Sequence, residues 1–230
     1  MATINPISYV LVTGGAGGIG SALCRLLPDF GMTPIIGFYR NENEAHLLAR
    51  ECGGLAVKID LSDDDSIASA IVTLESFIDS TGFIEAVVLG ASPAPDLVPF
   101  TSITAEILAN QFRVNVVGSQ LLLSGLIKQF FRKNKAGAVI GILTQALGSD
   151  AHPPATGMGA YVIAKSALRC MLLVCAAEYS WLKVRTISPS FTETKMLDVF
   201  DSRYLELIEA QYPFSSPQEV ALLIIKEILS

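Results

Sequence analysis

Apolar positions along the chain follow two different spacings. Six short runs rich in apolar residues predict buried β-strands at 9–12, 33–38, 55–59, 85–89, 138–143 and 183–187. Between these runs, apolar residues recur at the spacing of a helical face, which predicts helices at 21–27, 41–51, 63–80, 104–133, 161–179 and 220–229. A capping box with proline at the first helical position, Ser216-Pro217-Gln218-Glu219, marks the start of the last helix.

Strands alternate with helices along the whole chain, and no repeat, linker or low-complexity tract interrupts them. This order predicts an α/β fold, a doubly wound parallel sheet of the Rossmann type, in one domain spanning 1–230. The carboxyl ends of the strands then meet at one edge of the sheet, where ligands bind in such folds.

Composition narrows the class of protein further. The 230 residues are 51% apolar, enough for one large domain with a full core. A net charge of −6 without a basic cluster argues against nucleic acid or an anionic membrane as a partner. The chain begins without a signal-peptide pattern, and no apolar run approaches the ~20 residues of a membrane span. The four cysteines lack C-x-x-C spacing, so we expect reduced thiols, no metal site and a cytoplasmic location.

The segment 13–20, Thr-Gly-Gly-Ala-Gly-Gly-Ile-Gly, lies between the first predicted strand and the first predicted helix. Glycines let the backbone turn tightly and approach a pyrophosphate, and the amides that open the helix then point at the anion. The context therefore predicts a dinucleotide site. The glycines satisfy three spacings at once: G-x-G-x-x-G, T-G-x-x-x-G-x-G and T-G-x-x-G-x-x-G.

The end of the second strand indicates which dinucleotide is preferred. An acid there would bind the ribose 2′-hydroxyl of NAD, but Phe38-Tyr39-Arg40-Asn41 contains none before Glu42. A guanidinium pairs well with a 2′-phosphate, so the sequence favours NADP, with NAD as the alternative cofactor. The alternative role for Arg40 is that of a solvated loop arginine that binds no cofactor. Asp60, just past the third strand, either accepts a hydrogen bond from the adenine amino group or caps the following helix.

Tyr161 and Lys165 lie four residues apart on a predicted helix, so their side chains share a face. A lysine ammonium close to a phenol stabilises the phenolate, so we expect Lys165 to lower the pKa of Tyr161. Such a phenol can exchange a proton with an oxygen whose carbon exchanges hydride with nicotinamide. On its own this spacing is common by chance; after a glycine turn and a fifth strand it predicts a catalytic pair.

The chain resembles the short-chain dehydrogenase/reductase family over nearly its whole length, with a layout similar to the ketoacyl-carrier-protein reductases. The resemblance implies that Tyr161 and Lys165 transfer the proton and that Asn115 holds a water beside the lysine. It implies cofactor contacts along the same edge at Gly14, Gly18, Ile19, Gly20, Arg40, Asn41, Asp60, Leu61, Gly90, Ala91, Tyr161, Lys165, Pro189 and Thr194. The short chain has no room for the substrate domain of the family's extended branch, which includes sugar-nucleotide epimerases.

Three features depart from the family pattern. The family places a serine at the end of the fifth strand, where this chain has Thr144 and Gln145; we assign the substrate hydrogen bond to Thr144. Leu89-Gly90-Ala91-Ser92 replaces the usual N-N-A-G, which removes an asparagine that braces the site. The seventh strand of the family is missing, which puts in doubt any tetramer built through it.

Together these features predict an NADP(H)-dependent carbonyl reductase or alcohol dehydrogenase, acting on a small-molecule substrate that is partly apolar. An apolar-studded segment at 191–214 predicts a lid over that substrate. The helices bearing Asn115 and Tyr161 are apolar on more than one face, which predicts a homodimer through them. The missing serine leaves one rival of another class: a cofactor-binding redox sensor or scaffold with little catalysis.

Overall fold

The computed structural model describes residues 6–78 and 82–230 of the chain. The strands are β1 (Ile7–Thr13), β2 (Met32–Phe38), β3 (Leu55–Lys58), β4 (Gly82–Leu89), β5 (Ala138–Ile142) and β6 (Lys183–Ile187). The α-helices are α1 (Gly18–Leu26), α2 (Glu42–Cys52), α3 (Asp64–Ile78), α4 (Ala105–Phe112), α5 (Ser119–Leu126), α6 (Arg132–Asn134), α7 (Gly159–Glu178), α8 (Ser202–Gln211) and α9 (Pro217–Leu229). The last two positions predicted for the third helix, 79 and 80, and the first five residues of the predicted domain lie outside the described residues.

All six strands pair in parallel in one sheet, in the order β3-β2-β1-β4-β5-β6. The prediction of a doubly wound parallel sheet is therefore confirmed. The chain reverses its direction of winding at β1, which pairs with β2 on one side and β4 on the other. In such sheets the crevice for a ligand opens at this point, beyond the carboxyl ends of the strands.

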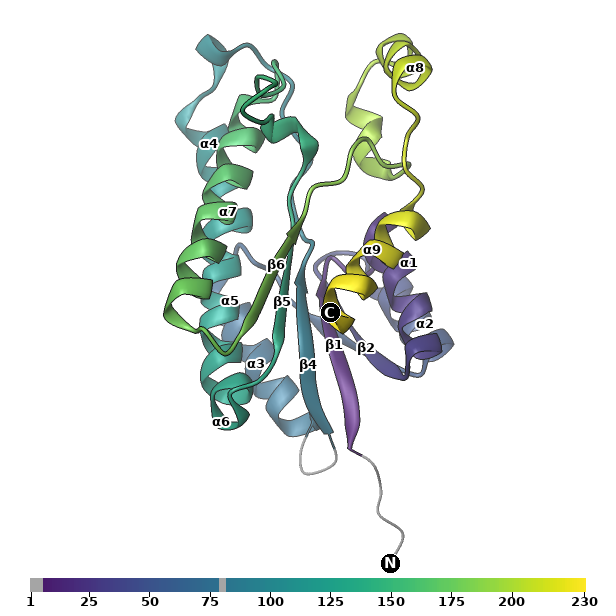
Figure 1. Cartoon of the computed structure of the whole chain (residues 1–230), viewed down its shortest axis with the longest axis vertical. Coiled ribbons are helices and arrows are strands. Elements are labelled where there is room, and N and C mark those ends of the chain that lie inside the picture. The colour runs from purple at the N-terminus through teal and green to yellow at the C-terminus, as the bar shows by residue number, and fades with distance from the viewer. Residues whose placement is uncertain (1–5, 79–81) are drawn as a thin grey trace, which may run out of the picture.

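Helices cover both faces of the sheet, so most residues of its central strands are buried (Figure 1). One face packs under α1, α2 and α9, with Leu23, Leu48 and Ile224 in its core. The other packs under α3, α5 and α7, with Leu74, Leu122 and Leu172 in its core. Apolar residues occupy nearly every position of β1 and β4 because both faces of these strands are covered.

The predicted helix 104–133 is present but is not a regular α-helix. Two π-helical segments interrupt it, η4 (Arg113–Gly118) between α4 and α5 and η5 (Ile127–Phe131) between α5 and α6. The hydrophobic pattern carries no sign of such a change in hydrogen bonding. Asn115 lies inside η4, and π-segments within α-helices are frequent at functional sites.

One sequence expectation about apolar runs was wrong. Helix α7 has 20 residues with a hydropathy of 1.6, long and apolar enough by length and composition to cross a membrane. It carries Tyr161 and Lys165, both buried, and packs against β6 and the helix segment that bears Asn115. One side of this helix is apolar because it packs on the sheet. On another side, the apolar side chains of Leu173 and Val174 are exposed.

The remaining short elements lie in the connections between these helices and strands. They are the 3₁₀ turns η1 (Leu27–Phe30), η3 (Phe100–Ser102), η6 (Gln145–Leu147) and η7 (Lys195–Val199). The segment 191–214 contains η7 and α8 and lies at the same end of the molecule as the start of α4 (Figure 1).

Candidate active site

The glycine turn joins β1 to α1 in a conformation that needs its glycines. Gly14 has a φ of 68°, which L-residues with a side chain rarely adopt. A β-carbon on Gly20 would lie 2.3 Å from the Gly14 carbonyl oxygen, so no side chain fits there. The turn closes through a bond from the Gly17 amide to the Gly14 carbonyl, 2.9 Å long.

The amino end of α1 is open to an anion. No side chain caps it, and its first intrahelical bond runs from the Ser21 amide to the Gly17 carbonyl. The amides of Gly18, Ile19 and Gly20 precede that bond and are therefore the helix donors without an intrahelical acceptor. This geometry fits the pyrophosphate of a dinucleotide, because such amides and the helix dipole both favour negative charge.

Thr13 ties the end of β1 to the end of β4. Its Oγ1 donates to the Val88 carbonyl (3.2 Å) and accepts from the amides of Gly90 (3.0 Å) and Ala91 (3.2 Å). Gly90 and Ala91, predicted as cofactor contacts, therefore lie beside the glycine turn with their amides already engaged. Any contact they make with a ligand has to come from their other atoms.

The predicted adenosine end of the crevice is polar and partly exposed. Arg40 stacks its guanidinium over the Tyr39 ring, 4.7 Å from the centroid, and takes part in none of the ion pairs of the described chain. Asn41 precedes α2 without capping it through its side chain. An arginine without an ion-pair partner in the described chain therefore follows β2, and its contact with a 2′-phosphate stays a prediction.

Asp60 follows β3 by two residues, next to the buried Leu61. Its Oδ1 accepts from both the amide (2.8 Å) and the hydroxyl (2.6 Å) of Ser62. The alternative that Asp60 caps the next helix is wrong, because its carboxylate bonds to Ser62, which lies before that helix begins at Asp64.

Tyr161 and Lys165 lie in the first turns of α7, and the structure buries both. The Lys165 side chain is 2% exposed. Its Nζ donates to the Ile142 carbonyl at the end of β5 (2.9 Å) and lies 5.7 Å from the centroid of the Tyr161 ring. The predicted pair is thus brought together at the carboxyl edge of the sheet.

Burial changes the acidity of both groups. It raises the pKa of Tyr161 to about 12, against the opposing effect of a hydrogen bond with the Thr144 side chain. It lowers the pKa of Lys165 to about 7, because the ammonium loses its hydration. Contrary to the expectation, the pKa of Tyr161 is raised, because the loss of water around the phenol is the largest effect on it.

Thr144 and Gln145 occupy the strand end where the family pattern has serine. The Thr144 side chain is hydrogen-bonded to Tyr161, and its Oγ1 also accepts from the Ala146 amide (3.1 Å), which caps η6. The Gln145 backbone amide donates to the Pro189 carbonyl (2.9 Å). Of the two, Thr144 is the residue whose side chain interacts with Tyr161, and its hydrogen bond to the substrate oxygen stays a prediction.

Asn115 is buried on η4, and its amide nitrogen is fully engaged. Nδ2 donates to the backbone carbonyl (3.1 Å) and to the side-chain Oε1 (3.2 Å) of Gln111. Its Oδ1 is buried without any hydrogen-bond partner in the described chain. An unpaired buried acceptor is costly, so this atom needs a donor such as a water molecule.

The segment after β6 covers the glycine turn. Thr194 lies so close that a β-carbon on Gly18 would be 2.3 Å from its Cγ2. Four rings hold the segment together, with Phe191 stacked on Phe214 at 5.3 Å and Phe200 on Tyr204 at 5.9 Å. Phe200 also packs against the small core that contains Tyr161. The predicted apolar lid thus reaches the catalytic helix, although most of its rings pack on one another.

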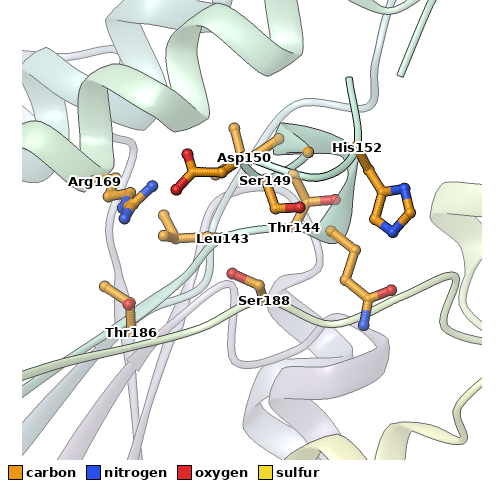
Figure 2. A pocket seen from close by; sticks show the side chains of 11 residues that line it. Leu143, Thr144, Ser149, Asp150, His152, Arg169, Thr186 and Ser188 are labelled. Atoms are coloured by element: carbon orange, nitrogen blue, oxygen red, sulfur yellow. The ribbon is translucent and has the colours of Figure 1, made fainter. Parts of the chain in front are cut away.

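A polar cavity of about 530 Å³ lies next to the site, between the loop after β5, the end of β6 and α7 (Figure 2). Thr144 and Gln145 belong to its lining, whereas Tyr161 and the glycine turn do not. His152 and Arg169 also line it, and the Arg169 side chain extends toward Asp150. The cavity therefore adjoins the predicted nucleotide site without including the glycine turn or Tyr161.

Three contacts of this site escaped the sequence interpretation. Thr13 was read only as part of the glycine motif, Gln111 was not singled out, and Phe200 was one of many lid residues. The spacing of Gln111 and Asn115, four apart on a helix, was the one available signal, since such pairs face each other.

Comparison with known proteins identifies the family. The sequence model of the short chain dehydrogenases matches residues 8–204. The chain belongs to the short-chain dehydrogenase family. It is therefore an NAD(P)-dependent dehydrogenase or reductase, as predicted.

Relatives of this short-chain dehydrogenase include two characterised enzymes. A 3-oxoacyl-[acyl-carrier-protein] reductase from Thermotoga maritima is 27% identical over 229 residues, covering 94% of this chain and 87% of the relative. A 2,5-dichloro-2,5-cyclohexadiene-1,4-diol dehydrogenase from Sphingobium indicum is 25% identical over 224 residues, covering 92% and 86%. In both comparisons the match extends over nearly the whole short-chain dehydrogenase.

A solved structure shares the fold. The 3-ketoacyl-(acyl-carrier-protein) reductase from Brucella melitensis, complexed with NADH, superposes with a TM-score of 0.83 at 21% identity. The match covers 96% of this chain and 90% of the reductase. It supports the single α/β sheet of the short-chain dehydrogenase described above.

Proposed function

We propose that this short-chain dehydrogenase reduces a ketone with NADPH, and that Tyr161 supplies the proton. The observation that carries the proposal is the placement of a buried Tyr161–Lys165 pair on the same sheet edge as an uncapped, glycine-lined helix end. When bound there, the cofactor would supply the hydride that reduces the carbonyl carbon.

Other residues would bind the cofactor, position the phenol and donate the proton. The amides of Gly18, Ile19 and Gly20 would bind the pyrophosphate, and Thr194 would close over it. Tyr161 would donate its proton to the carbonyl oxygen, while Thr144 holds the phenol through their hydrogen bond. A pKa near 12 keeps the phenol protonated at neutral pH, which is the form that a reduction requires.

Asn115 would hold a water molecule through its unpaired Oδ1, and that water would relay protons toward Lys165. Lys165 can exchange a proton close to neutral pH because burial sets its pKa near 7. We expect the substrate to be partly apolar, because Phe200 and Met158 adjoin Tyr161.

The experiment that tests the activity follows NADPH absorbance at 340 nm over a panel of ketones that ranges from aliphatic to aromatic and includes a 3-oxoacyl thioester. Turnover of any ketone at a rate far above the background supports the proposal. Tight NADPH binding without turnover of any compound would favour the rival function, a cofactor-binding sensor or scaffold.

NADP is the preferred form of the cofactor in this proposal. The support is Arg40, a cation after β2 without an ion-pair partner in the described chain, in a segment that lacks an acid. Replacing Arg40→Leu should weaken NADPH binding about tenfold or more and leave NADH binding nearly unchanged, since only a 2′-phosphate uses the guanidinium. Equal losses for both cofactors would contradict the NADP assignment.

We also propose a homodimer through η4, α5 and α7. Apolar side chains are exposed there at Val117 (41%), Leu173 (62%) and Val174 (52%), and apolar surface of this kind is typical of an interface. Light scattering after gel filtration should give twice the mass of 24.5 kDa, and Leu173→Glu should give one chain. A monomeric wild type would contradict the proposal.

A cytoplasmic location is the last part of the proposal. Its support is that all four cysteines are unpaired, including the exposed Cys170. Cell fractionation should recover the protein with cytoplasmic markers, and recovery in a membrane fraction would contradict it.

A further inference from the structure

Gln111 is a buried amide in the last turn of α4, immediately before the π-segment η4. Its side chain is fully buried, yet every polar atom of that side chain has a partner. Nε2 donates to the Ala94 carbonyl (2.8 Å), and Oε1 accepts from Asn115 Nδ2 (3.2 Å). Burying an amide is costly unless it is hydrogen-bonded, and these bonds offset that cost.

Gln111 fixes the orientation of the Asn115 amide through both its backbone and its side chain, because Asn115 Nδ2 donates to the Gln111 backbone carbonyl (3.1 Å) as well as to Oε1. The Ala94 carbonyl can only accept, so the Gln111 atom next to it has to be the nitrogen. The other Gln111 atom is then an acceptor, and the Asn115 atom that faces it has to be Nδ2. Asn115 Oδ1 is consequently the atom left unpaired.

The same glutamine holds the loop between β4 and α4 in place. Thr13 Oγ1 fastens the start of that loop at the Gly90 and Ala91 amides. At its far end, the Val98 amide donates to the Gly157 carbonyl (2.8 Å), next to the start of α7. Gln111 supplies the middle attachment. The loop segment 89–94 has no amide or carboxylate side chain of its own that could do so.

We propose that Gln111 is a positioning residue of the active site: it orients the Asn115 amide so that Oδ1 presents an acceptor, and it anchors the β4–α4 loop. Through this one side chain, the β4–α4 loop is hydrogen-bonded to the π-segment η4. The consequence for catalysis rests on the proposed function, whereas the orientation of Asn115 does not.

The first test compares Gln111→Met, which keeps the length of the side chain without its polar atoms, with the control Gln129→Met at an exposed position of η5, outside the proposed dimer interface. Side-chain amide exchange of Asn115, measured by NMR, should become at least about tenfold faster in Gln111→Met, because Nδ2 loses one of its two acceptors and keeps only the backbone carbonyl of residue 111. The ketone reductase kcat should fall on the order of ten- to a hundredfold, which is the size of loss that a misplacement of catalytic groups by about 1 Å can cause. The control should match wild type in both measurements.

A second variant separates positioning from simple loss of packing. In Gln111→Glu, an ionised carboxylate still accepts from Asn115 but cannot donate to the Ala94 carbonyl, whereas a protonated carboxyl can do both. The activity of this variant relative to wild type should therefore recover as the pH falls through the pKa of that carboxyl. A role in packing alone would give a ratio that does not change with pH.

A double-mutant cycle completes the test. If Gln111 acts on catalysis through Asn115, then Gln111→Met should have less than about a third of its effect on kcat in the Asn115→Ala background. Unchanged Asn115 amide exchange in Gln111→Met overturns the inference, whether or not the enzyme turns over any ketone. If the wild type reduces no ketone but Asn115 amide exchange changes as predicted in Gln111→Met, the proposed function is contradicted and the positioning role is supported.

Discussion

We predict that the buried ammonium of Lys165 lowers the free energy of unfolding of this protein at neutral pH. Its ammonium is almost completely buried and makes one hydrogen bond, to the Ile142 carbonyl. Burial lowers its pKa from an ordinary value of 10.5 to about 7. A shift of that size corresponds to up to about 5 kcal/mol against folding at pH 7 and below. Lys165→Met has a similar length and removes the charge.

The expected gain is the difference between two effects. The variant avoids the cost of burying an ionisable group, up to about 5 kcal/mol, but loses the bond to Ile142, worth about 2 kcal/mol. We expect Lys165→Met to be more stable than wild type by about 3 kcal/mol at pH 7. Urea unfolding of the cofactor-free protein measures this difference directly.

The pH dependence distinguishes this explanation from a general packing effect. Because the folded-state pKa lies below the unfolded one, the unfolded chain binds more protons between pH 7 and 10.5, and wild-type stability rises with pH there. The advantage of Lys165→Met should therefore shrink by roughly 2–3 kcal/mol between pH 7 and pH 9. As a control, Lys133 is exposed, so the difference in free energy of unfolding between Lys133→Met and wild type should not change with pH. A less stable Lys165→Met, or an advantage that does not change with pH, would refute the reasoning.

Two further predictions concern the glycine turn and the phenol. Gly20→Ala should abolish NADPH binding in a fluorescence titration, because its β-carbon would lie 2.3 Å from the Gly14 carbonyl oxygen and force the turn open; binding at wild-type affinity would contradict the proposed phosphate site. With an alcohol and NADP⁺, kcat should rise about tenfold per pH unit from pH 7 to 9, because oxidation needs the phenolate and burial holds the pKa of Tyr161 near 12; a profile flat over this range would mean that another group accepts the proton.

The fold was predictable because each signal was local. A run such as Val10-Leu11-Val12 between polar flanks indicates a buried strand, and the glycine turn after it indicates which strand comes first. The spacing of Tyr161 and Lys165 placed both on one face of a helix, and the register of the sheet then brought them to the ligand edge.

The features that escaped prediction depend on tertiary contacts. The pKa of Tyr161 is raised because the fold removes water from around the phenol, and no local sequence pattern indicates how much water is removed. The π-segment around Asn115 changes hydrogen bonding without changing the hydrophobic pattern. The roles of Thr13 and Gln111 follow from bonds to loop residues that the topology brings close.

The central claim is that Tyr161 donates the proton at a nicotinamide site on the carboxyl edge of the sheet. The most direct test measures NADPH affinity and ketone reduction in wild type and in Tyr161→Phe. The account predicts that the variant keeps its affinity for NADPH and loses about 10²–10⁴-fold in kcat, because only the hydroxyl is removed. A variant that reduces the ketone as fast as wild type would contradict it.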